Sequence, residues 1–159
     1  MIAKPRKKAK KVEKVPLIES EAPERLQYGA LPWRESKGGL EIMLVSSRET
    51  RRWIIPKGWP MSGRSGSAAA VIEAMEEAGL LGVISEKPIG AFHYVKRFSR
   101  GEELCRVEVF ALRVVRQRES WPEKHERDTR WFPAAEAAVL VSDAELGDLI
   151  VEFAGSFRN

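Results

Sequence analysis

One helix-like segment, residues 67–78, separates two groups of strand-like segments along this chain. Apolar runs bounded by turn residues predict the strands, at residues 26–33, 40–47, 53–55, 89–98, 104–115 and 130–132. Two more helices are expected near the C-terminus, at 134–139 and from a capping box at Ser142 to about Phe153. Strands come first, then a helix, then strands again and then helices, so the pattern predicts an α+β fold with a mixed β-sheet and helices packed on both of its faces.

The first residues differ in charge from the rest. Residues 1–15 contain seven basic side chains and one acid, a net charge of +6, which leaves −2 for the remainder of a chain whose total is +4. We therefore expect a basic N-terminal tail at 1–24 and one folded domain at 25–159. Such a tail can contact a polyanion, but a solvated terminus is the commoner case, so nucleic acid is not expected as a main partner.

The number of cysteines and the hydropathy of the chain indicate its cellular compartment. A single cysteine, Cys105, cannot form an internal disulfide, which indicates a reducing compartment. No apolar run reaches the roughly 18 residues that span a bilayer, and the basic N-terminus lacks the apolar segment of a signal peptide. We expect a cytoplasmic protein with no membrane partner; exposed strand edges would allow a homodimer without requiring one.

Three glutamates share one side of the predicted helix. At about 100° per residue, Glu73, Glu76 and Glu77 fall within an arc of about 100°. The opposite side, expected to face the core, holds Ala68, Val71, Met75 and Ala78. Small residues are expected to leave room for a ligand beside the acidic side: Ala69, Ala70 and Ala74. Clustered carboxylates repel one another unless a cation neutralises them, and hard oxygen ligands suit Mg²⁺ or Mn²⁺; a solvated acidic face is the alternative.

Cations and a glycine lie just before this helix. Arg51, Arg52, Lys57 and Gly58 combine positive charge with accessible backbone, as phosphate recognition beside a metal requires. The joint pattern indicates an anion-binding loop followed by a metal-binding helix.

Residues 58–80 resemble the box of the Nudix family: Gly, five residues, Glu, seven residues, then Arg-Glu-Uaa-x-Glu-Glu-x-Gly-Uaa, where Uaa is a large aliphatic residue. The residues in register are Gly58, Glu73, Glu76, Glu77, Gly79 and Leu80. Arg64 stands where the family has its first Glu, and Ile72 stands where it has Arg. In the family that arginine helps to hold the neighbouring carboxylate, so its replacement leaves the geometry of Glu73 open.

The resemblance implies a Nudix fold, an α/β/α sandwich, and Mg²⁺-dependent hydrolysis of a phosphoanhydride bond, with Mn²⁺ as a substitute. It implies that Glu73 and Glu77 bind the metal, one of them doubling as the base, and that Glu76 is a further ligand or positions water. By the same resemblance the Gly58 carbonyl completes the metal shell. Arg52 and Lys57 are the expected phosphate contacts.

Two further runs, VSSRETRRWIIPKGWP and RESWPEKHERDTRWFPAAEA, resemble the diphosphoinositol polyphosphate phosphohydrolase branch. They imply a phosphorylated small-molecule substrate, either a diphosphoinositol polyphosphate or a dinucleoside polyphosphate.

Several assignments stay open on sequence alone. Any of three loop carboxylates could join the site: Glu119, Glu123 or Glu126. Hairpin cations could extend its rim: Lys96, Arg97 and Arg100. His93 and His125 are expected to be structural or on the surface. Because Arg64 and Ile72 depart from the box, a phosphate-binding or regulatory module with weakened catalysis is the alternative function, and a nucleic-acid-binding protein led by the tail is a third.

Overall fold

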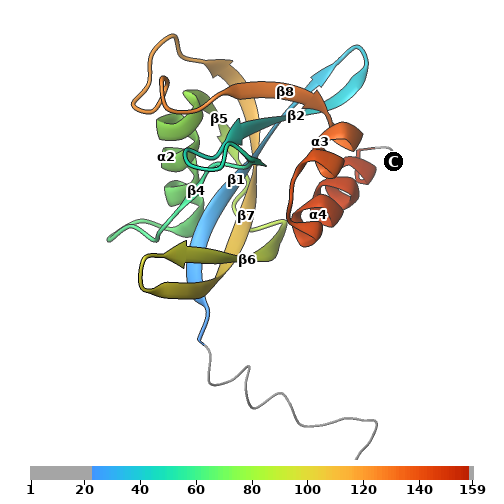
Figure 1. The fold of residues 1–159 in the computed structure, drawn as a ribbon. Coiled ribbons are helices and arrows are strands. Elements are labelled where there is room, and N and C mark those ends of the chain that lie inside the picture. The colour runs from blue at the N-terminus through green and yellow to red at the C-terminus, as the bar shows by residue number, and fades with distance from the viewer. Residues whose placement is uncertain (1–22, 158–159) are drawn as a thin grey trace, which may run out of the picture.

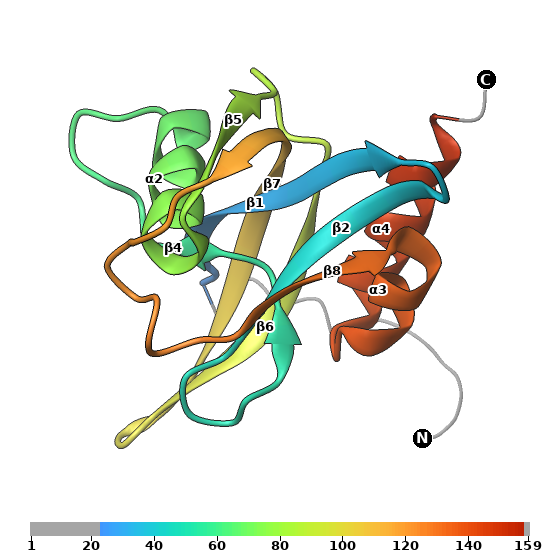
Figure 2. The ribbon, with the colours of Figure 1, turned by 90° about the horizontal axis from the view of Figure 1, so that it is seen from above.

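The computed structural model describes residues 23–157, so the basic segment 1–15 lies outside the described residues. Three layers are visible: helix α2 (Gly66–Ala78) covers one face of a β-sheet, while α3 (Ala134–Leu140) and α4 (Ala144–Gly155) cover the other (Figures 1 and 2). This confirms the predicted α/β/α sandwich. No helix among the described residues is long and apolar enough to cross a membrane.

The described residues form one eight-stranded sheet. Its strands are β1 (Arg25–Ser36), β2 (Gly39–Ser46), β3 (Trp53–Ile54), β4 (Lys57–Gly58), β5 (Leu80–Ile84), β6 (Gly90–Phe98), β7 (Gly101–Gln117) and β8 (Thr129–Pro133). The order is β3-β2-β1-β7-β5, with β4 on β1, β6 on β7 and β8 on β2. The central pair β1–β7 is parallel and the others are antiparallel, as a mixed sheet requires. The short β4 and β5 were absent from the sequence-based prediction.

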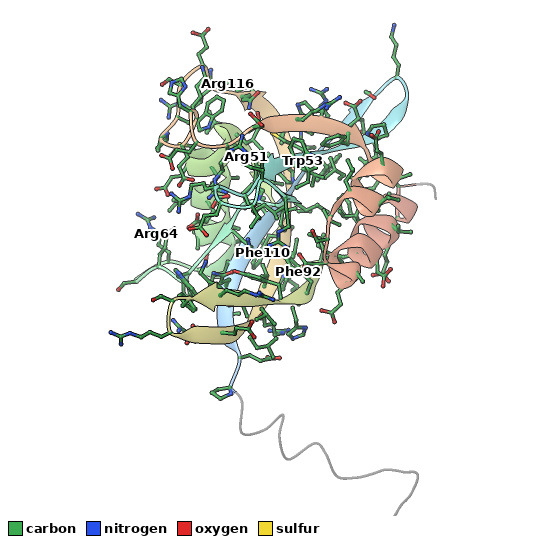
Figure 3. All side chains as sticks on the ribbon, in the orientation of Figure 1. Arg51, Trp53, Arg64, Phe92, Phe110 and Arg116 are labelled. Atoms are coloured by element: carbon green, nitrogen blue, oxygen red, sulfur yellow. The ribbon has the colours of Figure 1, made fainter. Side chains whose placement is uncertain are left out.

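Alternation along the strands gives each face its own core. On β1, Ala30 packs toward α2 and its neighbour Leu31 packs toward α3 and α4. Phe110 belongs to the α2 side and Phe92 to the α3–α4 side (Figure 3). Burial on both faces explains the nearly continuous apolar runs in the sequence.

Helix α2 begins and ends at residues suited to those positions. The Ser65 hydroxyl accepts a hydrogen bond from the Ala68 N–H at 3.2 Å, which satisfies one free donor of the first turn. Gly79 ends the helix in the left-handed region, at φ 70°. These two residues fix where the helix that carries the glutamates begins and ends.

The buried face of α2 differs from the predicted one. The side chains in the core are Ala69, Ala70, Ala74 and Ala78. Of the four residues expected there, only Ala78 is buried; the larger Val71 and Met75 stay half-exposed. Alanines let the helix approach the sheet closely, so Ala70 and Ala74, expected to leave room for a ligand, pack against the strands instead, and Ala69 is buried as well.

The predicted capping box at Ser142 is also wrong. Helix α4 has Asp143 as its N-cap, without a side-chain cap hydrogen bond. The Glu145 carboxylate instead accepts a hydrogen bond from the backbone N–H of His93 at 2.7 Å and lies 3.0 Å from its ring nitrogen Nδ1. The glutamate thereby ties α4 to β6.

The loop at 118–128, between β7 and β8, is docked on the C-terminal end of α2. The Gly79 carbonyl accepts from the Arg118 N–H at 2.8 Å, and the Glu76 carbonyl accepts from the Glu123 N–H at 3.0 Å. The Trp121 ring fills the space where a side chain at Gly79 would lie. The helix end and the loop therefore fit together only if residue 79 has no side chain.

Gly79→Ala is expected to lower the free energy of unfolding by more than Gly63→Ala. Both glycines have positive φ, 70° and 75°, but a side chain at Gly63 would meet open space. Gly63→Ala should therefore cost only the left-handed strain, about 1–2 kcal/mol, while Gly79→Ala adds about 1–3 kcal/mol from overpacking against Trp121. Urea unfolding measures both; equal losses would contradict the role of Trp121.

Candidate active site

A cavity of about 830 Å³ lies where α2, β6, the start of α4 and the loops after β2 and β7 converge. Its acidic lining residues are Glu49, Glu73, Glu77, Glu123 and Asp143, and its basic ones are Arg48, Arg52, Lys57, Lys96, Arg97 and Arg127. A volume of this size suits a small molecule. The mixture of carboxylates and many cations suits a polyanion bound together with a metal ion.

Two of the three predicted glutamates line this cavity. Glu73 and Glu77 lie one helical turn apart on α2, and Glu77 is only 5% exposed. Gly58 lies against the Glu73 carboxylate so closely that a side chain there would collide with it. The structure therefore brings Glu73, Glu77 and Gly58 together, in agreement with the spacing of the box.

Glu76 is not among the cavity-lining residues. It is half-exposed, and its backbone carbonyl holds the N–H of Glu123. On the helix it lies about 100° from Glu77, enough to turn its side chain from the cavity. Its predicted role as a ligand stays a prediction.

The surroundings of Glu77 are unusual for a carboxylate. Its Oε2 lies 3.7 Å from Nη2 of Arg127, while its Oε1 is buried without a hydrogen-bond partner among the described residues. Arg127 also donates from Nε to Glu123 at 2.7 Å and from Nη1 to the Ser46 carbonyl at 3.2 Å. A buried carboxylate oxygen with no partner is costly, and a bound cation would satisfy it.

Burial shifts the ionisation of the central groups. It raises the pKa of Glu77 to about 8, although Arg127 and Lys57 oppose the shift. Burial, with repulsion from Glu76, raises the pKa of Glu73 to about 7. Burial also lowers the pKa of Lys57, against the attraction of Glu77. Without a cation the charged forms of these groups are thus disfavoured, as at many functional sites.

The predicted phosphate contacts fall on the cavity wall. Arg52 and Lys57 both line it, and the Arg52 Nε donates to Thr50 Oγ1 at 3.0 Å. Arg51 instead pairs with Asp128 at 2.8 Å and is not a lining residue. Of the hairpin cations, Lys96 and Arg97 reach the cavity, and Arg100 lines a separate shallow hollow.

One of the three candidate loop carboxylates belongs to the site. Glu123 lines the cavity, whereas Glu126 pairs with Arg48 at 3.0 Å and Glu119 is exposed outside it. The histidines have other positions. His93 bridges Glu24 and Glu145, as a structural role predicts, and His125 is exposed.

Sequence reasoning missed four charged residues of the wall: Arg48, Glu49, Arg127 and Asp143. Arg127 follows Glu123 by four residues, and its pairing with Glu123 has the spacing of a helical ion pair. That spacing was the one signal for it, in a segment whose pattern predicts only a charged loop. Asp143 was passed over because Ser142 was assigned as the cap.

The donor set fits a hard divalent cation. Within residues 23–157, no group of three His, Cys, Asp or Glu side chains is gathered closely enough to hold a metal ion by itself. Mg²⁺, however, commonly binds through one or two carboxylates, with water and substrate phosphates as its other ligands. Glu73 and Glu77, with the bare Oε1 of Glu77, meet that need.

Comparison with known proteins shows the family of the chain. The NUDIX domain profile matches residues 23–151, most of the chain. The chain belongs to the NUDIX family. It is 32% identical over 133 residues to Nudix hydrolase 12, mitochondrial, of Arabidopsis thaliana, a match that covers 73% of this chain and 66% of that protein. It is 29% identical over 147 residues to Nudix hydrolase 13, mitochondrial, of the same plant, covering 81% of this chain and 73% of that protein.

Solved NUDIX structures share the fold. The crystal structure of C. elegans Ap4A hydrolase superposes with a TM-score of 0.63 over 85% of this chain and 99% of that chain, at 20% identity. The NUDIX domain of Shewanella oneidensis NrtR, complexed with ADP ribose, superposes with a TM-score of 0.60 over 84% of this chain and 90% of that chain, at 15% identity. The family assignment supports a hydrolase acting on phosphoanhydride bonds; the narrower diphosphoinositol branch stays a prediction.

The metal-free protein is expected to lose stability as the pH rises from about 5 to about 8. The folded pKa of Glu77, about 8, lies above its ordinary value of 4.5, so the folded state holds a proton that the unfolded state releases. The stabilisation is complete below the ordinary pKa and is lost as the pH rises through the folded one. Thermal unfolding with a chelator should show this slope, and Glu77→Gln should flatten it. A wild-type slope unchanged by Glu77→Gln would contradict the assignment.

Proposed function

We propose that this NUDIX protein is a pyrophosphohydrolase that uses Mg²⁺, or Mn²⁺ in its place, to cleave a phosphoanhydride bond in a phosphate-rich small molecule. The observation that carries the proposal is the buried, unpartnered Oε1 of Glu77 beside Glu73, on the wall of a cation-rich cavity. Carboxylates supply the metal ligands and the cations hold phosphates that do not react.

Each side chain has a role in this proposal. Glu73 and Glu77 hold the metal, which when bound neutralises phosphate charge and acidifies water. Glu123 keeps Arg127 in place at 2.7 Å. Arg52 and Lys57 hold the outer phosphates, and partial desolvation strengthens their charge-assisted contacts. Burial lowers the pKa of Lys57, whereas negative charge beside it, from Glu77 and from a bound phosphate, favours its charged form.

The proposed substrate is a diphosphoinositol polyphosphate or a dinucleoside polyphosphate. Six basic side chains line the cavity, which supports a molecule with several phosphates. One structural neighbour is the Ap4A hydrolase of C. elegans, which supports the dinucleoside class, while the two runs that resemble the diphosphoinositol branch support the other. A cytoplasmic location remains part of the proposal, although several relatives carry mitochondrial or chloroplastic in their names.

Glu77→Gln is expected to lower kcat by at least about 100-fold, because it removes a metal ligand while keeping the side-chain volume. The assay is metal-dependent release of phosphate or nucleotide from diphosphoinositol polyphosphates, dinucleoside polyphosphates, ADP-ribose and nucleoside triphosphates. Glu136→Gln, an exposed carboxylate on α3, is the matched control and should behave as the wild type. A wild type that binds these molecules without cleaving any of them would favour the regulatory module, to which Arg64 and Ile72 point.

Arg52→Ala is expected to raise KM about 10-fold or more while changing kcat little, because it removes a contact to a phosphate that does not react. Arg64→Ala is the charge-matched control. Arg64 is exposed, does not line the cavity, and lies on the loop before α2 on the side away from the sheet (Figure 3). Steady-state kinetics on the best substrate of the panel measures both; an equal rise in KM for the two variants would show only a loss of overall charge.

A further inference from the structure

Arg127 is a buried cation inside the site, and it reaches three acceptors at once. Its side chain is 9% exposed, with Nε at 2.7 Å from Glu123, Nη1 at 3.2 Å from the Ser46 carbonyl and Nη2 at 3.7 Å from Oε2 of Glu77. Only a planar guanidinium presents donors in three such directions; a lysine ammonium on a flexible stem does not. The side chain is thus held from two sides while its third edge faces the glutamate.

The loop that carries Arg127 is anchored on both sides of it. Before it, the Glu123 N–H is bonded to the Glu76 carbonyl of α2. After it, the Asp128 N–H donates to Ser46 Oγ at 2.9 Å, and the Asp128 carbonyl accepts from the Ser46 N–H at 3.0 Å. The guanidinium is therefore fixed relative to α2 and to β2 together.

This arrangement bears on the position where the chain departs from its family box. Residue 72, next to Glu73, is Ile, so α2 carries no cation of its own beside its glutamates. Residue 72 lies one helical turn before Glu76, and the Glu76 carbonyl is where the 118–128 loop docks. The 118–128 loop thus docks on α2 one helical turn beyond the position where the missing arginine would stand.

We propose that Arg127 is a positioning residue that supplies, from the 118–128 loop, the guanidinium that α2 lacks at Ile72, and that it orients Glu77 for the divalent cation. This inference rests on the proposed function for its catalytic consequence but not for its effect on ion binding. Arg127 faces Oε2 of Glu77 and leaves Oε1 bare, so one oxygen is held and the other is free for the ion. Groups that orient metal ligands in this way typically contribute about 10–100-fold in metal affinity or activity.

The test compares Arg127→Ala and Arg127→Lys with the wild type in three measurements. Calorimetry with Mn²⁺ alone gives ion affinity without any substrate, thermal unfolding with a chelator gives stability, and kinetics on the best substrate gives kcat and KM. Arg118→Ala is the matched control, because Arg118 lies on the same loop, is exposed and does not line the cavity.

Both Arg127 variants are expected to bind Mn²⁺ about 10-fold more weakly and to lose kcat with little change in KM, while the Arg118 variant keeps wild-type affinity. Adding Ile72→Arg to Arg127→Ala should restore part of both losses, which a role confined to holding the loop would not allow. The inference would be overturned if Arg127→Ala bound Mn²⁺ with wild-type affinity. It would also be overturned if Arg118→Ala lost as much affinity, or if adding Ile72→Arg restored none of the loss. A wild-type protein that binds Mn²⁺ but cleaves no substrate would contradict the proposed function. The Mn²⁺ affinities of the Arg127 variants would then still decide whether Arg127 positions Glu77.

Discussion

The Glu77 carboxylate is buried where α2 meets the 118–128 loop, and the arrangement of the site follows from that burial. A buried carboxylate is tolerated as an anion only when positive charge lies close to it. Lys57 and Arg127 supply part of that charge from two directions, and a bound cation would supply the rest. Each belongs to a segment held by the sheet, since β4 pairs with β1 and the loop is bonded to Ser46 at the end of β2. The strands that form the core thus also fix the charges around Glu77.

Because both faces of the sheet are buried, its strands appear in the sequence as apolar runs between turn residues. Most strands and all three helices could therefore be predicted from apolar periodicity and turn residues. The buried face of α2 was predicted wrongly, because a helical wheel favours large apolar residues such as Val71 and Met75. Contact with a sheet favours small ones when the helix lies close, and Ala70 and Ala74 are fully buried for that reason. Strand β5 was missed because its five residues are mostly half-buried or exposed and directly follow α2, so they form no apolar run of their own.

Site residues within a local motif could be predicted, whereas those positioned by contacts between distant segments could not. Glu73, Glu77 and Gly58 belong to one local motif, whose spacing fixes their relative positions. Glu123 could not be chosen over its neighbours, because an irregular loop has no period from which side-chain direction can be read. Its direction is set by a hydrogen bond to the Glu76 carbonyl, a contact between segments distant in sequence.

The two departures from the family box therefore have unequal consequences. Arg64 stands in an exposed loop outside the cavity, so the loss of a glutamate there changes no group that contacts the proposed ion (Figure 3). Ile72 lies beside Glu73, where a missing cation leaves buried negative charge less compensated. A guanidinium need not come from the same helix to act on a carboxylate, because only its distance and its direction matter. Arg127 lies 55 residues further along the chain and has both, so the box can lose its arginine while the fold keeps the charge.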